Sequence, residues 1–264
     1  MSAGPPHGDL ADFCAVAVMA KAPRIGEVKT RLTPPLSEPD AAQLSGCFIR
    51  DSAENVILAA RSAPLHGHVA YAPPGSEAAF RDLLPDTIQL LPSRRVGLGH
   101  SLADAARELL AAGYGSVCLV NSDSPTLPTS VLIDAARALR APGDRVVLGP
   151  AEDGGYYCIG LKGPHARLFE QIDWSTERVL AQTLDRAREI GLDTVILPSW
   201  YDVDDLPSLR RLADELLGRA FFHTGPIRYA APHTAAFLRR LAADDGGHRF
   251  GIALPGVPTG RARR

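Results

Sequence analysis

The stretch FCAVAVMAKAPRIGEVKTRL, residues 13–32, joins an unbroken apolar run to a loop that is rich in cationic side chains. An apolar run such as 13–20 is typical of a strand that is covered on both faces of a sheet. The residues after it contain Pro23 and Gly26, so we expect a loop there instead of a helix. The chain therefore predicts a buried strand with an extended loop at its carboxyl end.

The same alternation continues along the chain. Apolar runs predict strands over residues 13–20, 66–72, 87–91, 116–121, 145–150, 156–161 and 194–198. Helical periodicity predicts helices over 37–61, 76–84, 101–112, 129–140, 176–190 and 206–217. Repeated βα units predict an α/β protein with a mostly parallel sheet between two layers of helices, and the turn in GPAEDGGYYCIGL predicts one antiparallel strand.

The domain organisation follows from this pattern. Residues 1–12 form an N-terminal extension, residues 13–217 form one α/β domain, and residues 218–264 form a C-terminal appendage. The appendage has few apolar runs beyond 235–242, so we expect at most one helix in it, and we expect its last dozen residues to be mobile.

Composition excludes several classes of protein. Lys plus Arg is 28 and Asp plus Glu is 30, which gives a formal charge of −2, too close to neutral for nonspecific binding to nucleic acid or an anionic membrane. No apolar run approaches the roughly 20 residues of a membrane span, and residues 1–12 carry Asp9 and Asp12 where a signal peptide carries basic residues. We therefore expect a cytoplasmic protein without nucleic-acid or membrane partners.

The first loop gathers positive charge at the end of a strand. In open α/β sheets, ligands bind at the carboxyl ends of the strands. Lys21, Arg24, Lys29 and Arg31 surround Gly26 there, and cationic side chains with free backbone N–H groups are typical of a site for a di- or triphosphate. The alternative is a solvated basic loop.

Carboxylates follow two other strands. Asp123 comes directly after the strand 116–121, and Asp202 and Asp204 alternate along an extended segment after the last strand. Oxygen ligands of this kind suit Mg²⁺ or Mn²⁺ bound to phosphate oxygens. Alternatively, Asp123 ends its strand in an Asx turn; Asp205, next to this pair, is expected to cap the helix that follows.

Two glycine-containing turns complete the candidate site. Asp153 precedes Gly154 and Gly155, which would let the backbone approach a ligand while Asp153 serves as an acceptor or a base. Gly97 and Gly99 could expose backbone N–H groups to a nucleobase. Each pattern also has a purely structural interpretation, as a hairpin and as a turn.

Other chemistries lack a pattern in this sequence. The eight histidines show no metal-binding spacing, and no GxSxG-like motif predicts a nucleophile. The four cysteines form no CxxC pair, which favours reduced thiols over zinc or disulfides.

Five segments, in this order, resemble one known family: AKAPRIGEVKTRLTPPLS, NSDSPTLP, GPAEDGGYYCIGL, WSTERVLAQTLDRA and YDVDDLPSLRRL. They resemble the GT-A-fold transferase family associated with radical SAM and selenodomain proteins, within the nucleotide-diphospho-sugar transferase superfamily. The first loop and GLGHSLADA are also similar to 2-phospho-L-lactate guanylyltransferases. The resemblance covers about residues 13–217 and implies a three-layer α/β/α GT-A (Rossmann-like) fold.

The resemblance also implies roles for individual residues. Lys21, Arg24, Lys29 and Arg31 would hold nucleotide phosphates. Asp123 would bind the divalent metal with Asp202 or Asp204, and Asp153, Gly154 and Gly155 would face the acceptor or the sugar. The sequence departs from the usual DxD of sugar transferases, because Asn121 stands at the first position.

These observations leave three hypotheses. The first is a metal-dependent nucleotidyltransferase, in which Lys29, Asp123 and Asp153 serve catalysis and a small phosphorylated acceptor attacks a nucleoside triphosphate. The second is a glycosyltransferase that uses a nucleoside diphosphate sugar. The third is a non-catalytic module that binds a nucleotide or a protein partner. The base, the acceptor and the oligomeric state stay open at this level.

Overall fold

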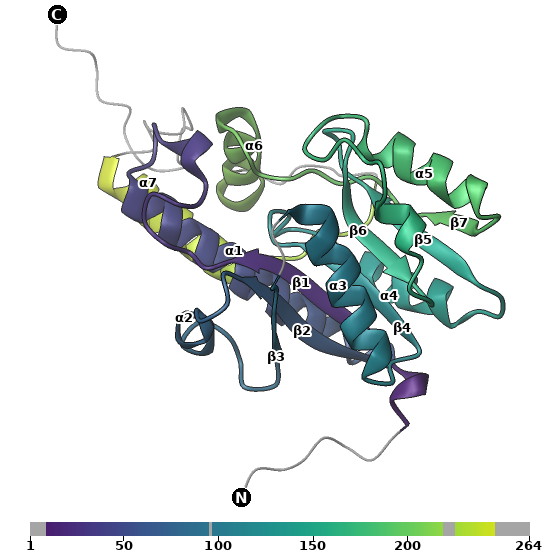
Figure 1. The fold of residues 1–264 in the computed structure, drawn as a ribbon. Coiled ribbons are helices and arrows are strands. Elements are labelled where there is room, and N and C mark those ends of the chain that lie inside the picture. Colours follow the sequence, from purple (N-terminus) through teal and green to yellow (C-terminus); the bar gives the residue numbers. More distant parts are fainter. Residues whose placement is uncertain (1–8, 95–96, 219–224, 246–264) are drawn as a thin grey trace, which may run out of the picture.

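The fold is a seven-stranded sheet between two layers of helices, here in a computed structural model that describes residues 9–94, 97–218 and 225–245 (Figure 1). The strands are β1 (Cys14–Lys21), β2 (Leu65–Ala72), β3 (Gln89–Pro92), β4 (Ser116–Asn121), β5 (Arg145–Pro150), β6 (Tyr156–Leu161) and β7 (Asp193–Ile196). The helices are α1 (Glu38–Ala59), α2 (Glu77–Arg81), α3 (Leu98–Ala111), α4 (Thr129–Arg140), α5 (Val179–Glu189), α6 (Leu206–Leu217) and α7 (Pro232–Asp245). None of these helices is both long and apolar enough to cross a membrane.

The strand order is β3-β2-β1-β4-β6-β5-β7, and every pair of neighbours is parallel except those that involve β6. The strand 156–161 thus inserts antiparallel, as the sequence predicts. The predicted three-layer α/β/α fold with a mostly parallel mixed sheet is confirmed.

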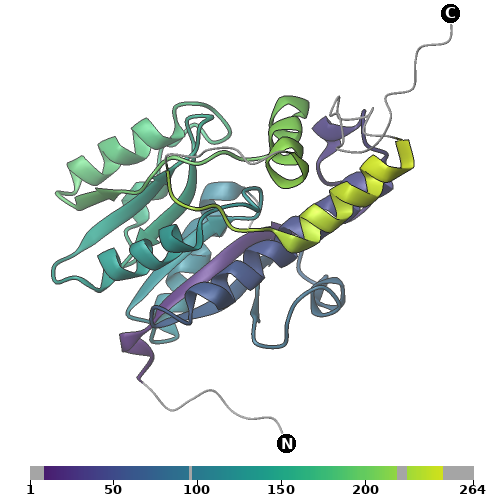
Figure 2. The same ribbon diagram turned by 180° about the vertical axis from the view of Figure 1, so that it is seen from behind.

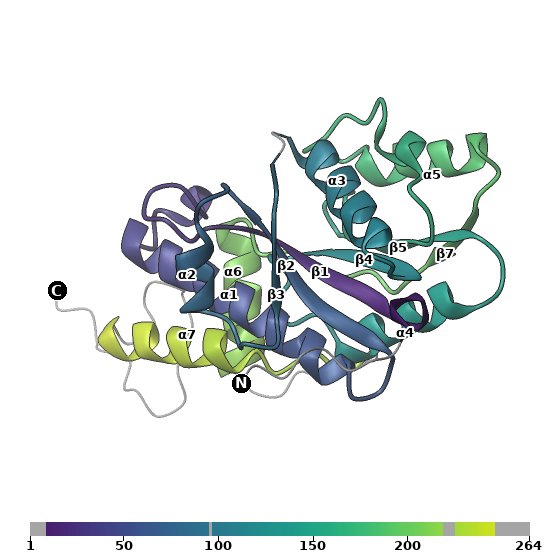
Figure 3. The ribbon, with the colours of Figure 1, turned by 60° about the horizontal axis from the view of Figure 1, so that its bottom comes forward.

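The two faces of the sheet are covered by different helices. Side chains of α1, α4, α6 and α7 pack on one face, whereas side chains of α3 and α5 pack on the other. Figures 1 and 2 show these layers from opposite sides, and Figure 3 shows the sheet between them. The central strands β1 and β4 have almost fully buried side chains, which explains their unbroken apolar sequences.

Two helices begin three residues away from the position that the sequence predicts. Helix α3 begins at Leu98 and not at Ser101, because Gly97 adopts a φ of 98° and its carbonyl already accepts from the Ser101 amide at 3.0 Å. Helix α5 begins at Val179 and not at 176, because Ser175 takes a left-handed φ of 64° and does not cap the helix. By contrast, Asp205 caps α6 through a capping box with Ser208, as expected.

Helix α7 comes from the region that the sequence sets apart as an appendage. It packs lengthwise against α1, as Figure 2 shows, and also contacts α6. Phe237, Leu238 and Leu241 are buried in the same cluster as the α1 side chains. The predicted mobility of the last dozen residues concerns a part of the chain outside the described residues, as do positions 1–8 of the predicted N-terminal extension.

Candidate functional site

The candidate site lies along one edge of the sheet. The carboxyl ends of the six parallel strands share this edge, and the antiparallel β6 begins there with Tyr156. The strand order reverses direction at β1, since the next strand in sequence, β2, lies on one side and β4 on the other. Such a switch point opens a crevice where α/β proteins bind ligands.

Lys29 lies at the centre of this edge. Its Nζ is 2.5 Å from Oδ1 of Asp123 and 2.9 Å from Oδ1 of Asp204, and it donates a hydrogen bond of 2.7 Å to the carbonyl oxygen of Val203. The Lys29 side chain is only 7% exposed. Burial lowers the pKa of this ammonium, but the charges of Asp123 and Asp204 outweigh it, so the pKa lies above its ordinary value. The two predicted metal-binding segments therefore converge on one cation of the predicted phosphate loop.

The chain after β7 crosses the sheet edge to reach this point. The Trp200 amide donates to the carbonyl of Pro150 at 3.1 Å, and the Val203 amide donates to the carbonyl of Asp123 at 2.9 Å. Val203 is fully buried, whereas its neighbours Asp202 and Asp204 are half-buried. One buried side chain thus places two carboxylates beside Asp123.

Asp202 is surrounded by other carboxylates. Its Oδ2 accepts a hydrogen bond of 3.3 Å from Nδ2 of Asn121. Burial, followed by the charges of Asp153, Asp204 and Asp123, raises the pKa of Asp202 to about 7. Asp202 therefore lies within reach of the charges of the other three predicted carboxylates.

Two buried oxygen atoms at this point have no hydrogen-bond partner in the structure: Oδ1 of Asp202 and Oδ1 of Asn121. Buried acceptors without a donor are costly, and a divalent cation is one group that satisfies oxygen acceptors. The single positive charge of Lys29 does not balance the four carboxylates. The oxygen donors are of the kind that Mg²⁺ or Mn²⁺ binds. Asp123, Asp202 and Asp204 are, however, not among the described groups whose ligand atoms lie within 4.8 Å of one another, so a cation held by all three would require their side chains to move.

The turn that carries Asp153 is held by helix α5. Asp153 Oδ1 accepts from the Gly155 amide at 2.8 Å, and the Leu180 amide donates to the Gly154 carbonyl at 3.0 Å. Gly154 has a φ of 90°, and a Cβ there would lie 2.3 Å from the carbonyl oxygen of Glu177. Glycine is therefore required at position 154 by the backbone and by its neighbour.

The other cations of the first loop lie in more open positions. Lys21, Arg24 and Arg31 are all exposed. Arg24 donates to Ser76 Oγ at 3.1 Å, in the loop after β2. The Asp205 carboxyl has a lowered pKa because Ser208 donates to it, with a smaller contribution from the charge of Arg31. Of the four predicted phosphate-binding cations, Lys29 is the one that contacts the carboxylates.

The glycines near α3 have a packing role. Gly99 is buried in the first turn of α3, and a Cβ there would lie 2.4 Å from the indole nitrogen of Trp174. Trp174 in turn meets the ring of Tyr156 edge-on, with ring centres 6.4 Å apart. Gly97 supplies the left-handed turn before α3. Gly26, with a φ of 75°, supplies a similar turn in the first loop, close to Glu38.

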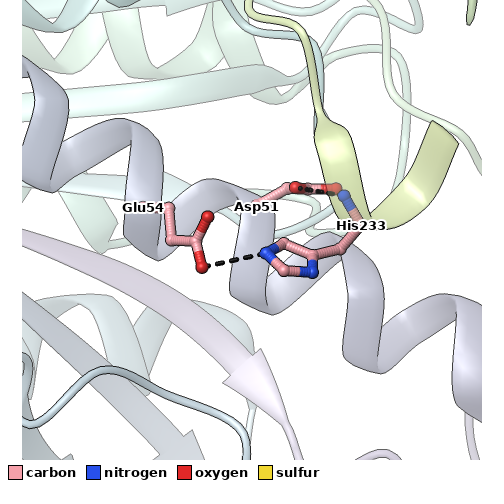
Figure 4. A group of neighbouring side chains, drawn as sticks. All are labelled: Asp51, Glu54 and His233. Carbon is pink, nitrogen blue, oxygen red and sulfur yellow. Dashed lines mark hydrogen bonds and ion pairs between the residues drawn. The ribbon is translucent and has the colours of Figure 1, made fainter. Parts of the chain in front are cut away.

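A second group of acidic and imidazole side chains lies away from this edge, where α7 meets α1 (Figure 4). Asp51, Glu54 and His233 have potential ligand atoms within 4.8 Å of one another. Both Asp51 oxygens already accept backbone hydrogen bonds, from His233 at 3.0 Å and from Thr234 at 2.7 Å. Glu54 accepts from His233 Nε2 at 2.9 Å and from Arg50 at 3.1 Å. These contacts fasten α7 to α1, which is sufficient to explain the group.

Several residues shape the site in ways that the sequence does not predict. Asn121, seen there as a departure from DxD, is a hydrogen-bond partner of Asp202. Val203 links two loops through its amide, and Arg211 on α6 pairs with Glu152 beside Asp153 at 2.7 Å. For Arg211, the sequence contains one indication of pairing, because Glu215 follows it at the i+4 position of the same helix.

Fold and site together define an α/β protein with a carboxylate-rich site at a strand-order switch point. Consistent with this, the chain is similar to a solved structure from Desulfovibrio desulfuricans G20, provisionally described as a nucleotide-diphospho-sugar transferase. The two are 27% identical with a TM-score of 0.71, over 87% of this chain and 97% of that one. The chain therefore has the fold of nucleotide-diphospho-sugar transferase-like proteins.

Other comparisons give matches over shorter segments or to more distant relatives. The model of the family DUF2064, described as uncharacterized protein conserved in bacteria, matches residues 56–176, a segment that includes Asp123 and Asp153. The bifunctional protein GlmU of Dinoroseobacter shibae is 37% identical over 100 residues, which are 37% of this chain and 21% of that protein's length. A cytidylyltransferase structure from Leptospira borgpetersenii is 10% identical, with a TM-score of 0.49 over 92% of this chain and 98% of that one.

Proposed function

We propose that the protein is a cation-dependent nucleotidyltransferase that transfers a nucleoside monophosphate from a nucleoside triphosphate to a small phosphorylated acceptor. The observation that carries this proposal is the convergence of Asp123 and Asp204 on the buried ammonium of Lys29, with Asp202 and Asn121 beside them. This arrangement combines oxygen ligands with a cation at the edge of the sheet where such folds bind nucleotides.

The reaction forms one bond and breaks another. An oxygen of the acceptor attacks the α-phosphorus, while the bond from that phosphorus to the pyrophosphate oxygen breaks and pyrophosphate leaves with the electron pair. Asp123, Asp202 and Asp204 would hold a bound Mg²⁺ or Mn²⁺, which would neutralise part of the negative charge on the phosphate oxygens.

The chain's own residues have distinct roles in this reaction. Lys29 places positive charge where the leaving group becomes more negative, and its pairing with Asp123 and Asp204 fixes its position before the nucleotide binds. Lys21, Arg24 and Arg31 are exposed on the same loop and would bind the outer phosphates. Asp153 would face the acceptor, on a turn that Gly154 and α5 hold in place.

A second function is favoured by one observation. The Desulfovibrio desulfuricans structure, similar over 97% of its chain, is described provisionally as a nucleotide-diphospho-sugar transferase. In that case the same carboxylates and cation would bind a nucleoside diphosphate sugar, and Asp153 would lie near the acceptor hydroxyl.

Thermal unfolding with different ligands separates the possibilities. We would measure the unfolding midpoint with nucleoside triphosphates, nucleoside diphosphates and nucleotide sugars, each with and without Mg²⁺. A ligand at 100 times its Kd adds about 2.7 kcal/mol of apparent stability. Cation-dependent stabilisation by triphosphates supports nucleotidyl transfer, and selective stabilisation by nucleotide sugars supports glycosyl transfer. Absence of any cation-dependent nucleotide effect contradicts both enzymes and favours a non-catalytic module.

Two variants give this experiment its control. Asp123→Asn removes a proposed cation ligand and is expected to abolish the cation-dependent part of the stabilisation. Asp134→Asn removes an exposed carboxylate of α4, 56% accessible, and is expected to leave the stabilisation unchanged.

A further inference from the structure

Arg211 on α6 contacts both loops that bring carboxylates to the site from the β5–β6 and β7 sides. Its Nη1 is 2.7 Å from Oε2 of Glu152, the residue before Asp153. Its guanidinium carbon lies 3.8 Å from the centre of the Tyr201 ring, and Tyr201 directly precedes Asp202. A single side chain therefore spans the neighbours of two proposed site residues.

The contacts continue to the third carboxylate-bearing loop. Arg211 Nε is 3.4 Å from Oε1 of Glu215, and Tyr201 donates its hydroxyl hydrogen to Oε2 of Glu215 at 2.6 Å. Thr126, three residues after Asp123, donates to the Tyr201 hydroxyl at 3.3 Å. Tyr201 and Thr126 are buried, and the Glu215 side chain is 9% exposed. These side-chain contacts, from Arg211 through Glu215 and Tyr201 to Thr126, thus join α6 to the loop after β4.

We propose that Arg211 is a positioning residue, which holds the segment of the proposed cation ligand Asp202 against the turn of Asp153 and the loop after β4. The inference rests on the proposed function, because it concerns the same site. Arginine suits this role, since its planar guanidinium can pair with two carboxylates while it stacks on an aromatic ring. Residues that orient metal ligands in this way affect metal affinity without touching the ion.

The loops keep other connections when Arg211 is removed. The Glu152 amide donates to the Trp200 carbonyl at 3.1 Å, and Val203 stays bound to Asp123 through the backbone. We therefore expect loss of Arg211 to loosen the spacing of the carboxylates without unfolding the domain. A merely stabilising surface ion pair would instead leave the affinity for the cation unchanged.

Direct binding of Mn²⁺ to the full chain tests this role, with free Mn²⁺ measured by electron paramagnetic resonance. Arg211→Met is expected to raise the Kd for Mn²⁺ by about 10- to 100-fold. Arg211→Lys keeps the charge but lacks the planar group, so partial recovery is expected. Arg210→Met is the matched control, because it removes an exposed cation one position away on the same helix, and its Kd is expected to equal that of the wild type.

Folding of each variant is checked by circular dichroism and thermal unfolding. A folded Arg211→Met variant whose Kd lies within about twofold of wild type overturns the positioning role while the proposed function stands. If Arg211→Met does not fold, Glu152→Ala decides, because it removes one arm of the same contact on an exposed residue. An unchanged Kd there overturns the inference, and a raised Kd supports it. Wild-type protein that binds no Mn²⁺ overturns the proposed function and this inference with it.

Discussion

The backbone amide of Val203 donates a hydrogen bond of 2.9 Å to the backbone carbonyl of Asp123. This bond joins the segment after the edge strand β7 to the end of the central strand β4. Because backbone atoms make it, this bond fixes how far the backbone at Asp123 lies from the backbone that carries Asp202 and Asp204. The site therefore has a rigid base to which Lys29 adds the central charge.

Replacement of Lys29 should affect the rate more than substrate binding. Lys29→Ala removes a charge contact that strengthens as pyrophosphate leaves, so kcat is expected to fall about a hundredfold with a smaller change in KM. Steady-state kinetics with a nucleoside triphosphate and Mg²⁺ measures this. Glu27→Ala, in the same loop but 61% exposed, is the control. The opposite pattern would contradict this role: if Lys29→Ala keeps turnover within about twofold of wild type while Glu27→Ala loses activity, the basic loop is only a solvated surface.

Replacement of Asp202 by asparagine should stabilise the protein at high pH. Its pKa in the folded protein, about 7, lies above the ordinary value of 3.8, so the folded state binds the proton more tightly and loses stability as the pH rises between these values. Asp202→Asn removes this effect. We expect the variant to have a higher unfolding midpoint than wild type at pH 8 without divalent cations, and the difference to vanish near pH 4.

Thermal unfolding across this pH range measures the effect, with Asp134→Asn as an exposed control. The addition of Mg²⁺ at pH 8 should reverse the order, because the wild type gains a bound ion and the variant loses a ligand. Equal midpoints of wild type and Asp202→Asn at all pH values would contradict the crowding of carboxylates at the site.

Gly154 and Gly155 should differ sharply in their tolerance of alanine. A Cβ at Gly154 meets the Glu177 carbonyl oxygen at 2.3 Å in a left-handed backbone, whereas a Cβ at Gly155 meets only the Asp153 side chain, at 3.1 Å. Gly154→Ala is expected to cost about 1–3 kcal/mol of stability and to displace the start of α5. Gly155→Ala should cost less. Chemical denaturation of both variants tests the difference, and equal losses would refute it.

Asp51 should stabilise the docking of α7. It accepts hydrogen bonds from two amides in the first turn of that helix, so Asp51→Ala is expected to cost about 1–2 kcal/mol, as loss of a helix cap does. Hydrogen exchange should quicken in α7 more than in β4. Glu54→Gln, which keeps the cap, serves as control. Wild-type protein treated with a chelator provides a further check. Faster hydrogen exchange at residues 51–54 and 232–245 after this treatment would indicate a bound metal instead.

The sequence predicts the sheet well because its strands are apolar runs bounded by turn residues. The rule that ligands bind at the carboxyl ends of strands also brings Lys29, Asp123 and Asp204 to the same edge, where the structure places them in contact. Their chemical roles remain proposals. Local patterns were less informative at Gly99, since a glycine that makes room for Trp174 and one that exposes an amide to a ligand look alike in sequence.

Contacts between distant segments account for what the sequence did not predict. Arg211 and Glu152 are 59 positions apart, and Asp51 binds an amide 182 positions away. Periodicity reports which face of a helix is apolar, but it does not identify the partner of a charged side chain. The docking of α7 on α1 and the role of Arg211 therefore required the three-dimensional structure.

The lengthwise packing of α7 on α1 also bears on synthesis of the chain. Helix α1 is synthesised before the side chains that cover it, Phe237, Leu238 and Leu241 of α7. During translation one apolar flank of α1 therefore stays open to solvent or to a chaperone. This layer is therefore completed only after the sheet edge that carries Lys29 and Asp204 has been synthesised.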